Sequence, residues 1–426
     1  MKLSKSGHAL LAVAVSIGIG LGITSCGESN TIDYLYVTAS KNNPGQISVY
    51  LVDQISGALT QIKDSPYSSG GRNPVAEVTS PNGKNLYVLN HDDNTLVDFA
   101  IGTDAKLYPQ HTYNTPGTEP IALAMNSAGT LLFVADTFQP GFSDANPGPG
   151  ALVVYPVNSD GSLGDAITNT TVTPNVPFWP VENNPSSVNV TALLTTSATT
   201  DFVYVVNTNT AAQRGTVSGF SFSTASGGGA LTPIPGSPCV AELHSSGNNC
   251  FQAGVAPNAS ASDPTGRFYY VTDGTTNQLI AYGIQANGAL IPVQNGPFKT
   301  DVFPDAVTVS ASGNYIYVAN FNSNDISAYQ IDQGTGAPTS LATANFATKT
   351  GPTCVLIEPA FGRYLYTSNF LDSSITGYKA DPNTGLLTGT ENNPYPSAGQ
   401  PTCAAAIAHG NHATEHVQAS SGNGAS

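Results

Sequence analysis

One short motif recurs seven times along this chain, and it constrains the fold more than any other feature of the sequence. The motif is an aromatic residue followed by Val or Thr, and in six copies an Asn or Asp stands three residues after the aromatic. The aromatic residues are Tyr36, Tyr87, Phe133, Tyr204, Tyr270, Tyr317 and Tyr366. A repeat of this size indicates an array of similar supersecondary units that bury their surfaces against one another.

Each repeat contains the signals of four short strands. Before the motif, a Pro, a short apolar stretch and a turn-forming Gly, as from Pro120 to Gly129, predict an inner strand and a hairpin. The motif itself forms the second strand. Alternating segments such as Ile326 to Tyr329 predict a third strand, and a turn such as Asn287-Gly288 leads to a fourth. Four antiparallel strands make one blade of a β-propeller.

The two ends of the chain complement each other. The first repeat begins at Tyr34 without an inner strand, and the segment from Pro401 to Gly410 has the spacing of an inner strand with no repeat after it. We therefore predict an all-β fold, a single seven-bladed β-propeller with four-stranded antiparallel blades over residues 34–410. The C-terminal inner strand completes blade one and closes the ring, which removes exposed strand edges.

The N-terminus has the features of a targeting segment. Residues 1–25 carry Lys2 and Lys5 before an apolar, Gly-rich stretch that is short for a membrane span. The residues that end in Cys26 resemble the lipobox of bacterial lipoproteins, in which this Cys is lipid-modified; the alternative is an ordinary signal peptide. We expect residues 1–25 to be a lipoprotein signal peptide and residues 26–33 a tether, so that Cys26 anchors an extracytoplasmic protein to a lipid membrane.

Composition limits the partners. The formal net charge is −15, and it becomes −17 without Lys2 and Lys5. Because no basic cluster is present to neutralise phosphates, we expect no nucleic-acid partner, and we expect a monomer. Residues 411–426 are rich in Ser, Gly and Asn and predict a disordered tail; the alternative is a helix in which His409, His412 and His416 bind a metal.

Four cysteines follow Cys26, an even number that permits disulfides in an exported protein. We expect Cys239 and Cys250 to pin the Ser, Gly and Asn-rich segment between them. Cys354 and Cys403 occupy the same place in two inner strands of neighbouring blades, so a bridge between them would staple the ring. The alternative is two buried free thiols.

Long loops mark where specificity is expected in a repeat protein. The interval from Phe133 to Tyr204 is 71 residues and the next, to Tyr270, is 66, against 46 to 51 in the other four. The added residues predict a wall of loops over one mouth of the channel. These loops are residues 137–150, 170–184 and 239–252.

The second of these loops contains the only Trp of the chain, Trp179, next to Phe178 and near Glu182. We expect these three residues to bind a ligand, because aromatic rings on a loop can stack against a sugar or a peptide. The alternative is that the rings anchor their own loop to the core.

The Asn or Asp of the motif has two interpretations. Such a side chain can begin an Asx-turn in the loop that leaves the second strand, which is the expectation. A ring of oxygen ligands around a central cation is the alternative. Nothing in the sequence supports a bound metal, and we expect no cofactor.

Four polar residues of repeats two and three form the candidate catalytic site. Arg72 precedes one inner strand, His91 and Asp92 follow the second strand of the same repeat, and Glu119 precedes the next inner strand. All four should face one channel mouth. A His with a near-neutral pKa beside a carboxylate and an Arg can open an ester by general-base catalysis on water. We assign Arg72, His91 and Glu119 to catalysis and Asp92 to binding. The alternative is that all four are ordinary polar residues of surface loops.

The pattern Pro74-x8-Gly83-x3-Tyr87-Val88-x-Asn90 resembles the seven-bladed lactonase family, which includes 6-phosphogluconolactonase, and the related YVTN repeat proteins of cell surfaces. The resemblance covers residues 34–410 and implies the fold more strongly than the activity. Phosphosugar lactonases of the family carry Pro-Arg-His type sequences at their inner strands. Here the corresponding sites, such as Arg72-Asn73-Pro74, lack the Arg-His pair.

Two functions follow from this sequence. The first is a lipid-anchored binding or interaction module that takes an unknown small molecule, glycan or protein at the channel mouth. The alternative is a lactonase that opens an unphosphorylated lactone by general-base attack of water. The sequence favours the first, because it lacks the Arg-His pair and carries few cationic residues for a phosphorylated substrate.

Overall fold

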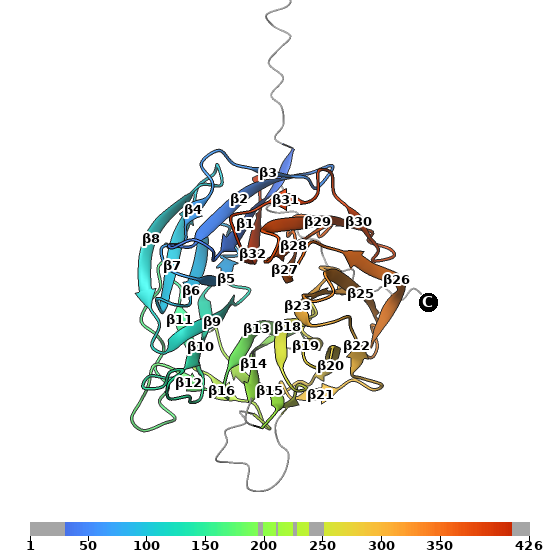
Figure 1. Cartoon of the computed structure of the whole chain (residues 1–426). Helices are drawn as coiled ribbons and strands as arrows, with labels where there is room; N and C mark the ends of the chain where they lie inside the picture. Colours follow the sequence, from blue (N-terminus) through green and yellow to red (C-terminus); the bar gives the residue numbers. More distant parts are fainter. Residues whose placement is uncertain (1–29, 195–198, 210–211, 225–227, 238–250, 411–426) are drawn as a thin grey trace, which may run out of the picture.

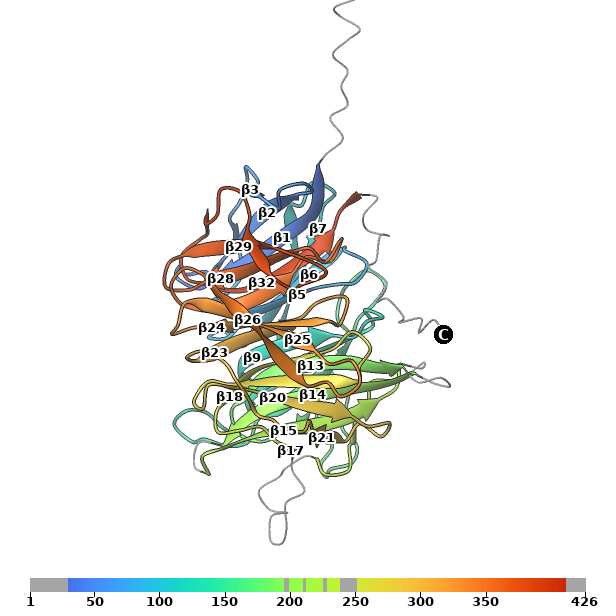
Figure 2. The same ribbon diagram turned by 90° about the vertical axis from the view of Figure 1, so that its right-hand side faces the viewer.

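The fold is a closed ring of seven antiparallel sheets, as the sequence predicts (Figure 1). The computed structural model describes residues 30–194, 199–209, 212–224, 228–237 and 251–410. Figure 2 shows the ring turned by 90°, with the strands from the two ends of the chain side by side. Outside the described residues lie the predicted signal peptide, the predicted tail 411–426, and Cys26, Cys239 and Cys250.

The strands group into blades as follows. Blade one has β32 (Pro401–Ala408), β1 (Thr31–Ala39), β2 (Gln46–Asp53), β3 (Leu59–Gln61) and β4 (Tyr67–Ser68), and blade two has β5 (Pro74–Thr79), β6 (Asn85–Asn90), β7 (Thr95–Ile101) and β8 (Leu107–Asn114). Blade three has β9 (Thr118–Met125), β10 (Leu131–Phe138), β11 (Ala151–Pro156) and β12 (Trp179–Pro180). Blade four has β13 (Pro185–Leu194), β14 (Thr199–Asn209), β15 (Arg214–Phe222), β16 (Thr232–Pro233) and β17 (Phe251–Gln252). Blade five has β18 (Pro257–Ser262), β19 (Phe268–Asp273), β20 (Gln278–Ile284), β21 (Leu290–Pro292) and β22 (Phe298–Lys299), and blade six has β23 (Pro304–Val309), β24 (Tyr315–Asn320), β25 (Asp325–Ile331) and β26 (Pro338–Ala347). Blade seven has β27 (Pro352–Ile357), β28 (Tyr364–Asn369), β29 (Ser374–Ala380), β30 (Leu387–Gly389) and β31 (Tyr395–Pro396).

The second strand of each blade carries the repeated motif and lies in the core. Every residue of β6, β19, β24 and β28 is buried. Because both faces of a blade pack against neighbouring blades, these strands are apolar on both faces and rich in aromatic and β-branched residues.

Six of the seven inner strands begin at the predicted proline; β9 begins two residues earlier, at Thr118. Proline has no N–H group to donate, so the first position of a strand suits it. In blade two the register shifts directly after this residue, between Pro74 and Ala76, and the bulge lets the strand continue.

The ring closes as the sequence predicts. β32 pairs with β1 from Asp33 opposite Ala408 to Ala39 opposite Pro401. β1 begins at Thr31, so residues 31–33 belong to the strand rather than to the tether to which the sequence assigned them. The reason is burial: Ile32 has no exposed area and packs between blades one and seven.

The aromatic residue of the motif binds the next blade. In six blades this residue is a tyrosine, and its hydroxyl donates to a backbone carbonyl in the turn between the third and fourth strands of the following blade. We call this contact the forward hydrogen bond. The donors and acceptors are Tyr36 and Ala105, Tyr87 and Gly161, Tyr204 and Gly288, Tyr270 and Gly336, Tyr317 and Gly385, and Tyr366 and Gly57, at 2.7 to 3.3 Å.

A second set of tyrosines, on the third strands, binds the preceding blade. We call this contact the backward hydrogen bond. The donors and acceptors are Tyr50 and Pro396, Tyr155 and Asn114, Tyr282 and Gln252, Tyr329 and Lys299, and Tyr378 and Ala347. The closing junction between blades seven and one therefore carries both kinds of bond, as do four junctions within the continuous chain. The junction between blades one and two has the forward bond alone, because Phe99 stands at the backward position of blade two.

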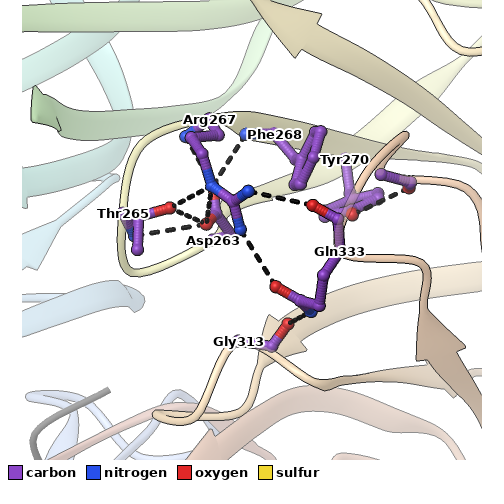
Figure 3. A network of polar contacts seen from close by, with 8 residues as sticks. Asp263, Thr265, Arg267, Phe268, Tyr270, Gly313 and Gln333 are labelled. Carbon is purple, nitrogen blue, oxygen red and sulfur yellow. Dashed lines mark hydrogen bonds and ion pairs between the residues drawn. The ribbon is translucent and has the colours of Figure 1, made fainter. Parts of the chain in front are cut away.

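The junction between blades five and six shows how side chains support the forward bond (Figure 3). Asp263, in the turn between β18 and β19, accepts a hydrogen bond from the backbone N–H of Arg267 at 2.7 Å. The Arg267 guanidinium donates to the backbone oxygen and to Oε1 of Gln333, each at 2.9 Å. Gln333 lies in the blade-six turn that contains Gly336, the acceptor of the Tyr270 hydroxyl. The turn is thus held from two directions.

The junction between blades three and four lacks both tyrosines. Phe133 replaces the forward donor of blade three, and Phe220 replaces the backward donor of blade four. An apolar cluster fills this junction, in which the rings of Phe133 and Phe222 lie 5.0 Å apart. Within the described part of blades three and four, apolar contacts replace the tyrosine hydrogen bonds at this junction.

Phe178 and Trp179 are core residues, so the prediction that they form a ligand platform is wrong. Trp179 begins β12, the fourth strand of blade three, and pairs with Leu152 of β11. Neighbouring residues of a strand point to opposite faces, so Phe178 packs toward blade two and Trp179 toward blade four. In the sequence this segment resembles a loop, because the strand has only two residues and stands among prolines.

We expect Trp179→Ala to lower the free energy of unfolding by about 3 to 5 kcal/mol, the usual loss for a large buried aromatic side chain. Trp179→Phe, which keeps part of the apolar contact, should lose clearly less. Urea denaturation followed by circular dichroism measures both, because the mutation removes the only Trp fluorophore. A loss below about 1 kcal/mol in Trp179→Ala would show that the ring does not depend on this side chain.

A buried acid lies at the closing junction. Asp33 has no exposed area, and its Oδ1 accepts a hydrogen bond from the backbone N–H of Ala360 at 3.3 Å. Burial, and then repulsion from the Glu358 carboxylate, raise the pKa of Asp33 to about 9. Asp33 is therefore protonated at neutral pH in the folded protein.

The contribution of Asp33 to stability should fall as pH rises from about 4 to about 9. Over this range the folded state keeps the Asp33 proton and the unfolded state has lost it, so the slope reaches about 1.4 kcal/mol per pH unit. Asp33→Asn cannot ionise, and its stability should decline less with pH. Chemical denaturation of both proteins at about pH 5 and about pH 8.5 tests this. The same decline in both proteins would mean that Asp33 does not titrate as inferred.

Candidate functional site

Arg72, His91, Asp92 and Glu119 lie around one pocket at a mouth of the channel. The pocket has a volume of about 450 Å³, which is within the range of small-molecule sites. It opens between blades two and three, where the turn after β6 meets the loops before β5 and β9. Its lining residues are Arg72, His91, Asp92, Asn94, Thr118, Glu119, Ser143 and Asp144.

The long loop between β10 and β11 forms one side of this pocket through Ser143 and Asp144. The Thr118 hydroxyl donates to the carbonyl of Phe142 at 3.3 Å and so ties the loop to the start of β9. Of the three predicted long loops, residues 137–150 thus reach the pocket. Residues 170–184 contribute the fourth strand of blade three instead, and the third loop lies mostly outside the described residues.

His91 and Asp92 form a hydrogen-bonded pair. Nδ1 of His91 lies 2.8 Å from Oδ1 of Asp92, and the amide of Asn73 donates to the same oxygen at 3.0 Å. The hydrogen bond from Asn73, followed by that from His91, lowers the pKa of Asp92. An ionised Asp92 favours the His91 tautomer with its proton on Nδ1, which leaves Nε2 able to accept a proton.

Arg72 is held beside this pair. Its Nε donates to Oδ1 of Asp93 at 2.6 Å, and its Nη2 donates to the carbonyl of Asp92 at 2.9 Å. The backbone N–H of Arg72 donates to the other Asp93 oxygen at 2.7 Å. These contacts fix the guanidinium and place a carboxylate next to its charge. Nη1 is not used by these contacts.

Glu119 is fixed through its backbone. Its N–H donates to Oδ1 of Asn94 at 2.7 Å, and its carbonyl accepts from the hydroxyl of Thr137 at 2.6 Å. Its φ of +55° is unfavourable for a residue that carries a Cβ and precedes a proline. Asn73, also before a proline, has φ +51°, and its carbonyl accepts from the backbone N–H of His91 at 3.0 Å. Asn184, Phe303 and Gln400 also have positive φ before an inner-strand proline, so this backbone conformation belongs to the repeat rather than to the pocket.

The sequence analysis missed Asp93 and Asn94. Asp93 binds Arg72, and Asn94 holds the backbone of Glu119. A signal for Asn94 was present, because Asn277 and Asn324 stand at the same place in their repeats. Their side chains likewise accept from the backbone before an inner-strand proline, at 2.8 and 2.9 Å. No recurrence of this kind in the sequence indicated a role for Asp93.

Glu182 is a structural residue, and its assignment to ligand binding is wrong. It is 5% exposed, and Arg214 donates to its Oε1 at 3.2 Å. The hydroxyl of Thr216 donates to Oε2 at 3.3 Å. A buried carboxylate paired in this way joins blades three and four and is removed from the channel mouth.

Cys354 and Cys403 are free thiols, so the predicted bridge between them is absent from the structure. Their Sγ atoms lie 3.9 Å apart, well beyond the length of about 2.05 Å of a disulfide. The inner strands bring the two residues together as the sequence predicts, but the spacing between neighbouring blades leaves the sulfurs in contact without a bond.

The Asn or Asp of the motif is fully buried and serves the fold. Asp273 accepts from the backbone N–H of Thr275 at 3.0 Å, which is the predicted Asx-turn. Asp136 instead accepts from the N–H of Gly117 at 2.8 Å, in the loop that precedes β9.

Among the described residues, no group of three or more His, Cys, Asp or Glu side chains has the geometry of a metal site. The described segments also contain no helix long and apolar enough to cross a membrane.

Similar proteins support the sequence resemblance. The family described as Lactonase, 7-bladed beta-propeller matches residues 33–140 and 244–357, which is more than half of the chain. A comparison with curated proteins found no significant match.

Solved structures of similar fold come from several bacteria. The periplasmic gluconolactonase PpgL of Pseudomonas aeruginosa has a TM-score of 0.66 at 17% identity, over 89% of this chain and 100% of that one. A candidate 6-phosphogluconolactonase of Bacteroides fragilis has a TM-score of 0.65 at 18% identity, over 89% and 98%. Hydrazine synthase of Kuenenia stuttgartiensis, at TM-score 0.54 and 14% identity over 81% and 94%, shows that the fold alone does not set the chemistry. The family match and the closed seven-bladed ring together show that this chain belongs to the seven-bladed β-propeller lactonase family.

Proposed function

We propose that this protein hydrolyses an unphosphorylated lactone in the pocket between blades two and three. The observation that carries the proposal is the 2.8 Å hydrogen bond between His91 and Asp92 in a pocket that Arg72 and Glu119 also line. Membership of a lactonase family supports the same class of reaction, as does the name gluconolactonase borne by the Pseudomonas protein of similar fold.

His91 acts as the general base in this proposal. Asp92 accepts a hydrogen bond from the Nδ1–H group, so Nε2 takes a proton from water while the water oxygen attacks the carbonyl carbon of the lactone. The ring C–O bond of the tetrahedral intermediate then breaks, and the leaving oxygen takes the proton back from Nε2. The product is the open hydroxy acid. Arg72 has Nη1 available to stabilise the oxyanion, and Glu119 can accept a hydrogen bond from a substrate hydroxyl.

The charges around the pocket favour a neutral substrate. Asp92, Glu119 and Asp144 bring three carboxyl side chains to its lining, and the charge of Arg72 already faces Asp93. A phosphate group would meet repulsion here with no free cationic pair to hold it. We therefore infer a lactone with hydroxyl groups rather than a phosphorylated one.

A panel of sugar lactones and simple lactones, with a phosphorylated sugar lactone for comparison, tests the proposal on the purified protein. We expect His91→Ala to lower kcat/KM by about 100-fold to 10,000-fold, the usual contribution of a general base. Asp92→Asn should lower kcat more than it raises KM, because it disturbs the His91 tautomer. His111→Ala is the matched control, since His111 lies on β8 and pairs with Asp98 away from the pocket.

Two results would contradict the hydrolase proposal. One is the absence of hydrolysis across the panel by folded wild-type protein, and the other is equal activity in wild type and His91→Ala. Faster turnover of the phosphorylated lactone would reject the inferred substrate class while leaving the reaction in place.

The binding or interaction module favoured by the sequence remains a second candidate. The openness of the pocket supports it, because the side chains of Arg72 and Asp92 are 50% and 43% exposed. Calorimetry with a lactam, which resembles a lactone but resists hydrolysis, separates the two functions. Binding that depends on His91 without any lactone turnover would favour the binding module.

We also propose that Cys26 anchors the protein to a membrane, with the propeller outside the cytoplasm. The apolar segment before Cys26 and the short distance from Cys26 to Thr31, where β1 begins, support this. The five residues span at most about 18 Å, so the ring would lie close to the lipid surface.

We expect wild-type protein to partition into the detergent phase of a cell extract and Cys26→Ala to move to the aqueous phase or to remain an unprocessed precursor. Cys239→Ala is the control for loss of a cysteine outside the proposed lipobox. Mass spectrometry of the mature N-terminus gives an independent readout. Identical partition of wild type and Cys26→Ala, with a mature chain that starts elsewhere, would reject the anchor.

A further inference from the structure

Two thiols meet at the closing junction of the ring, outside the pocket described above. Cys354 lies on β27 and Cys403 on β32, and their Sγ atoms are 3.9 Å apart. Both residues are partly exposed. Inner strands surround the channel, so these thiols can be reached from solvent although they lie between blades.

The pair departs from the pattern of the repeat. Cys354 and Cys403 are the inner-strand residues that resume pairing after the bulge, opposite Ser368 and Thr38. The other blades carry small residues without a thiol at this position. Those residues include Ala76, Ala122, Ser187 and Ala306. The fold therefore requires a small side chain here and does not require sulfur.

A buried carboxyl from a third blade stands next to the thiols. Glu77 on β5 is 6% exposed, and its Oε1 accepts the backbone N–H of Thr38 at 3.1 Å. Its Oε2 is buried without a hydrogen-bond partner, and the Glu77 carboxyl interacts electrostatically with Cys403.

Glu77 also departs from the repeat. The corresponding positions, which pair with the Val or Thr of the motif, hold apolar side chains in blades three, four, six and seven, namely Leu123, Val188, Val307 and Val355. The acid at this position is therefore, like the two thiols, a side chain that the repeat does not require.

We propose that Cys354 and Cys403 form a binding site for a monovalent soft cation, Cu(I), beside the Glu77 carboxyl. Two sulfurs bound to one ion at about 2.3 Å each lie at most about 4.6 Å apart, so the 3.9 Å separation fits a bent S–Cu–S arrangement without movement of the strands. Thiolate ligands select Cu(I) over hard cations. Zinc sites use three or four protein ligands and iron–sulfur clusters four, whereas the described residues offer two thiols here.

Binding is a ligand exchange without a redox step. Each thiol releases its proton to solvent, two Cu–S bonds form, and the ligands that carried Cu(I) to the protein leave. The complex of one Cu(I) with two thiolates carries one negative charge. The cation offsets one of the two thiolate charges that would otherwise lie together.

Transfer of Cu(I) from a coloured chelator under anaerobic conditions tests the proposal. The full-length chain with Cys26→Ser, Cys239→Ser and Cys250→Ser retains only the two thiols in question. We expect it to take up one Cu(I) per chain. A further Cys354→Ser or Cys403→Ser change should weaken binding by roughly 100-fold or more, since it removes one of two direct ligands. Thr353→Ala, next to Cys354, is the matched control and should bind like the parent.

Three results would overturn the site. The first is failure of the folded parent to compete with the chelator. The second is equal Cu(I) uptake by the parent and by Cys354→Ser, both shown to be folded by circular dichroism. The third is a thiol titration of the parent, purified without reductant, that finds no free thiols, because the pair would then form a disulfide rather than a metal site.

Discussion

The hydrogen bond from a buried tyrosine to a turn of the neighbouring blade is the interaction on which this ring depends. Each blade is a small sheet that cannot bury its own faces, and the forward and backward bonds fix where each face meets the next. One such bond contributes about 1 kcal/mol, but leaving a buried hydroxyl and a buried carbonyl unpaired costs more. The bonds therefore define a single arrangement of blades more than they add to total stability.

Most of the fold follows from the sequence because its signals repeat. The Pro, Gly and aromatic positions identify the strands, and the unmatched segment at Pro401 identifies the closure. The role of the tyrosine hydroxyl in the motif is harder to predict from the sequence. The hydroxyl bonds to the next blade, and no pattern within one repeat identifies its acceptor. Trp179 illustrates the same limit: a two-residue strand carries no periodic signal, and only the neighbouring blade reveals that the ring is buried.

The candidate site was predictable in part. Chain position placed Arg72, His91, Asp92 and Glu119 at one mouth, because the loops before inner strands and after second strands gather there. Their pairing depends on side-chain geometry that no spacing encodes. Asp93 takes up the charge of Arg72, and Asn94 orders Glu119. These two neighbours thus fix Arg72 and Glu119 around the hydrogen-bonded pair of His91 and Asp92, on which the proposed hydrolase activity rests.

The junction of blades three and four gives the ring an uneven stiffness. Blade three is joined to blade two by two tyrosine hydrogen bonds, through Tyr87 and Tyr155, whereas its opposite face meets blade four through apolar contacts and the Glu182 ion pair. Apolar surfaces can slide by small steps that a directional bond resists. Blades two and three therefore share directional bonds that blades three and four lack in the described residues, and the pocket lies at the better-bonded of these two junctions.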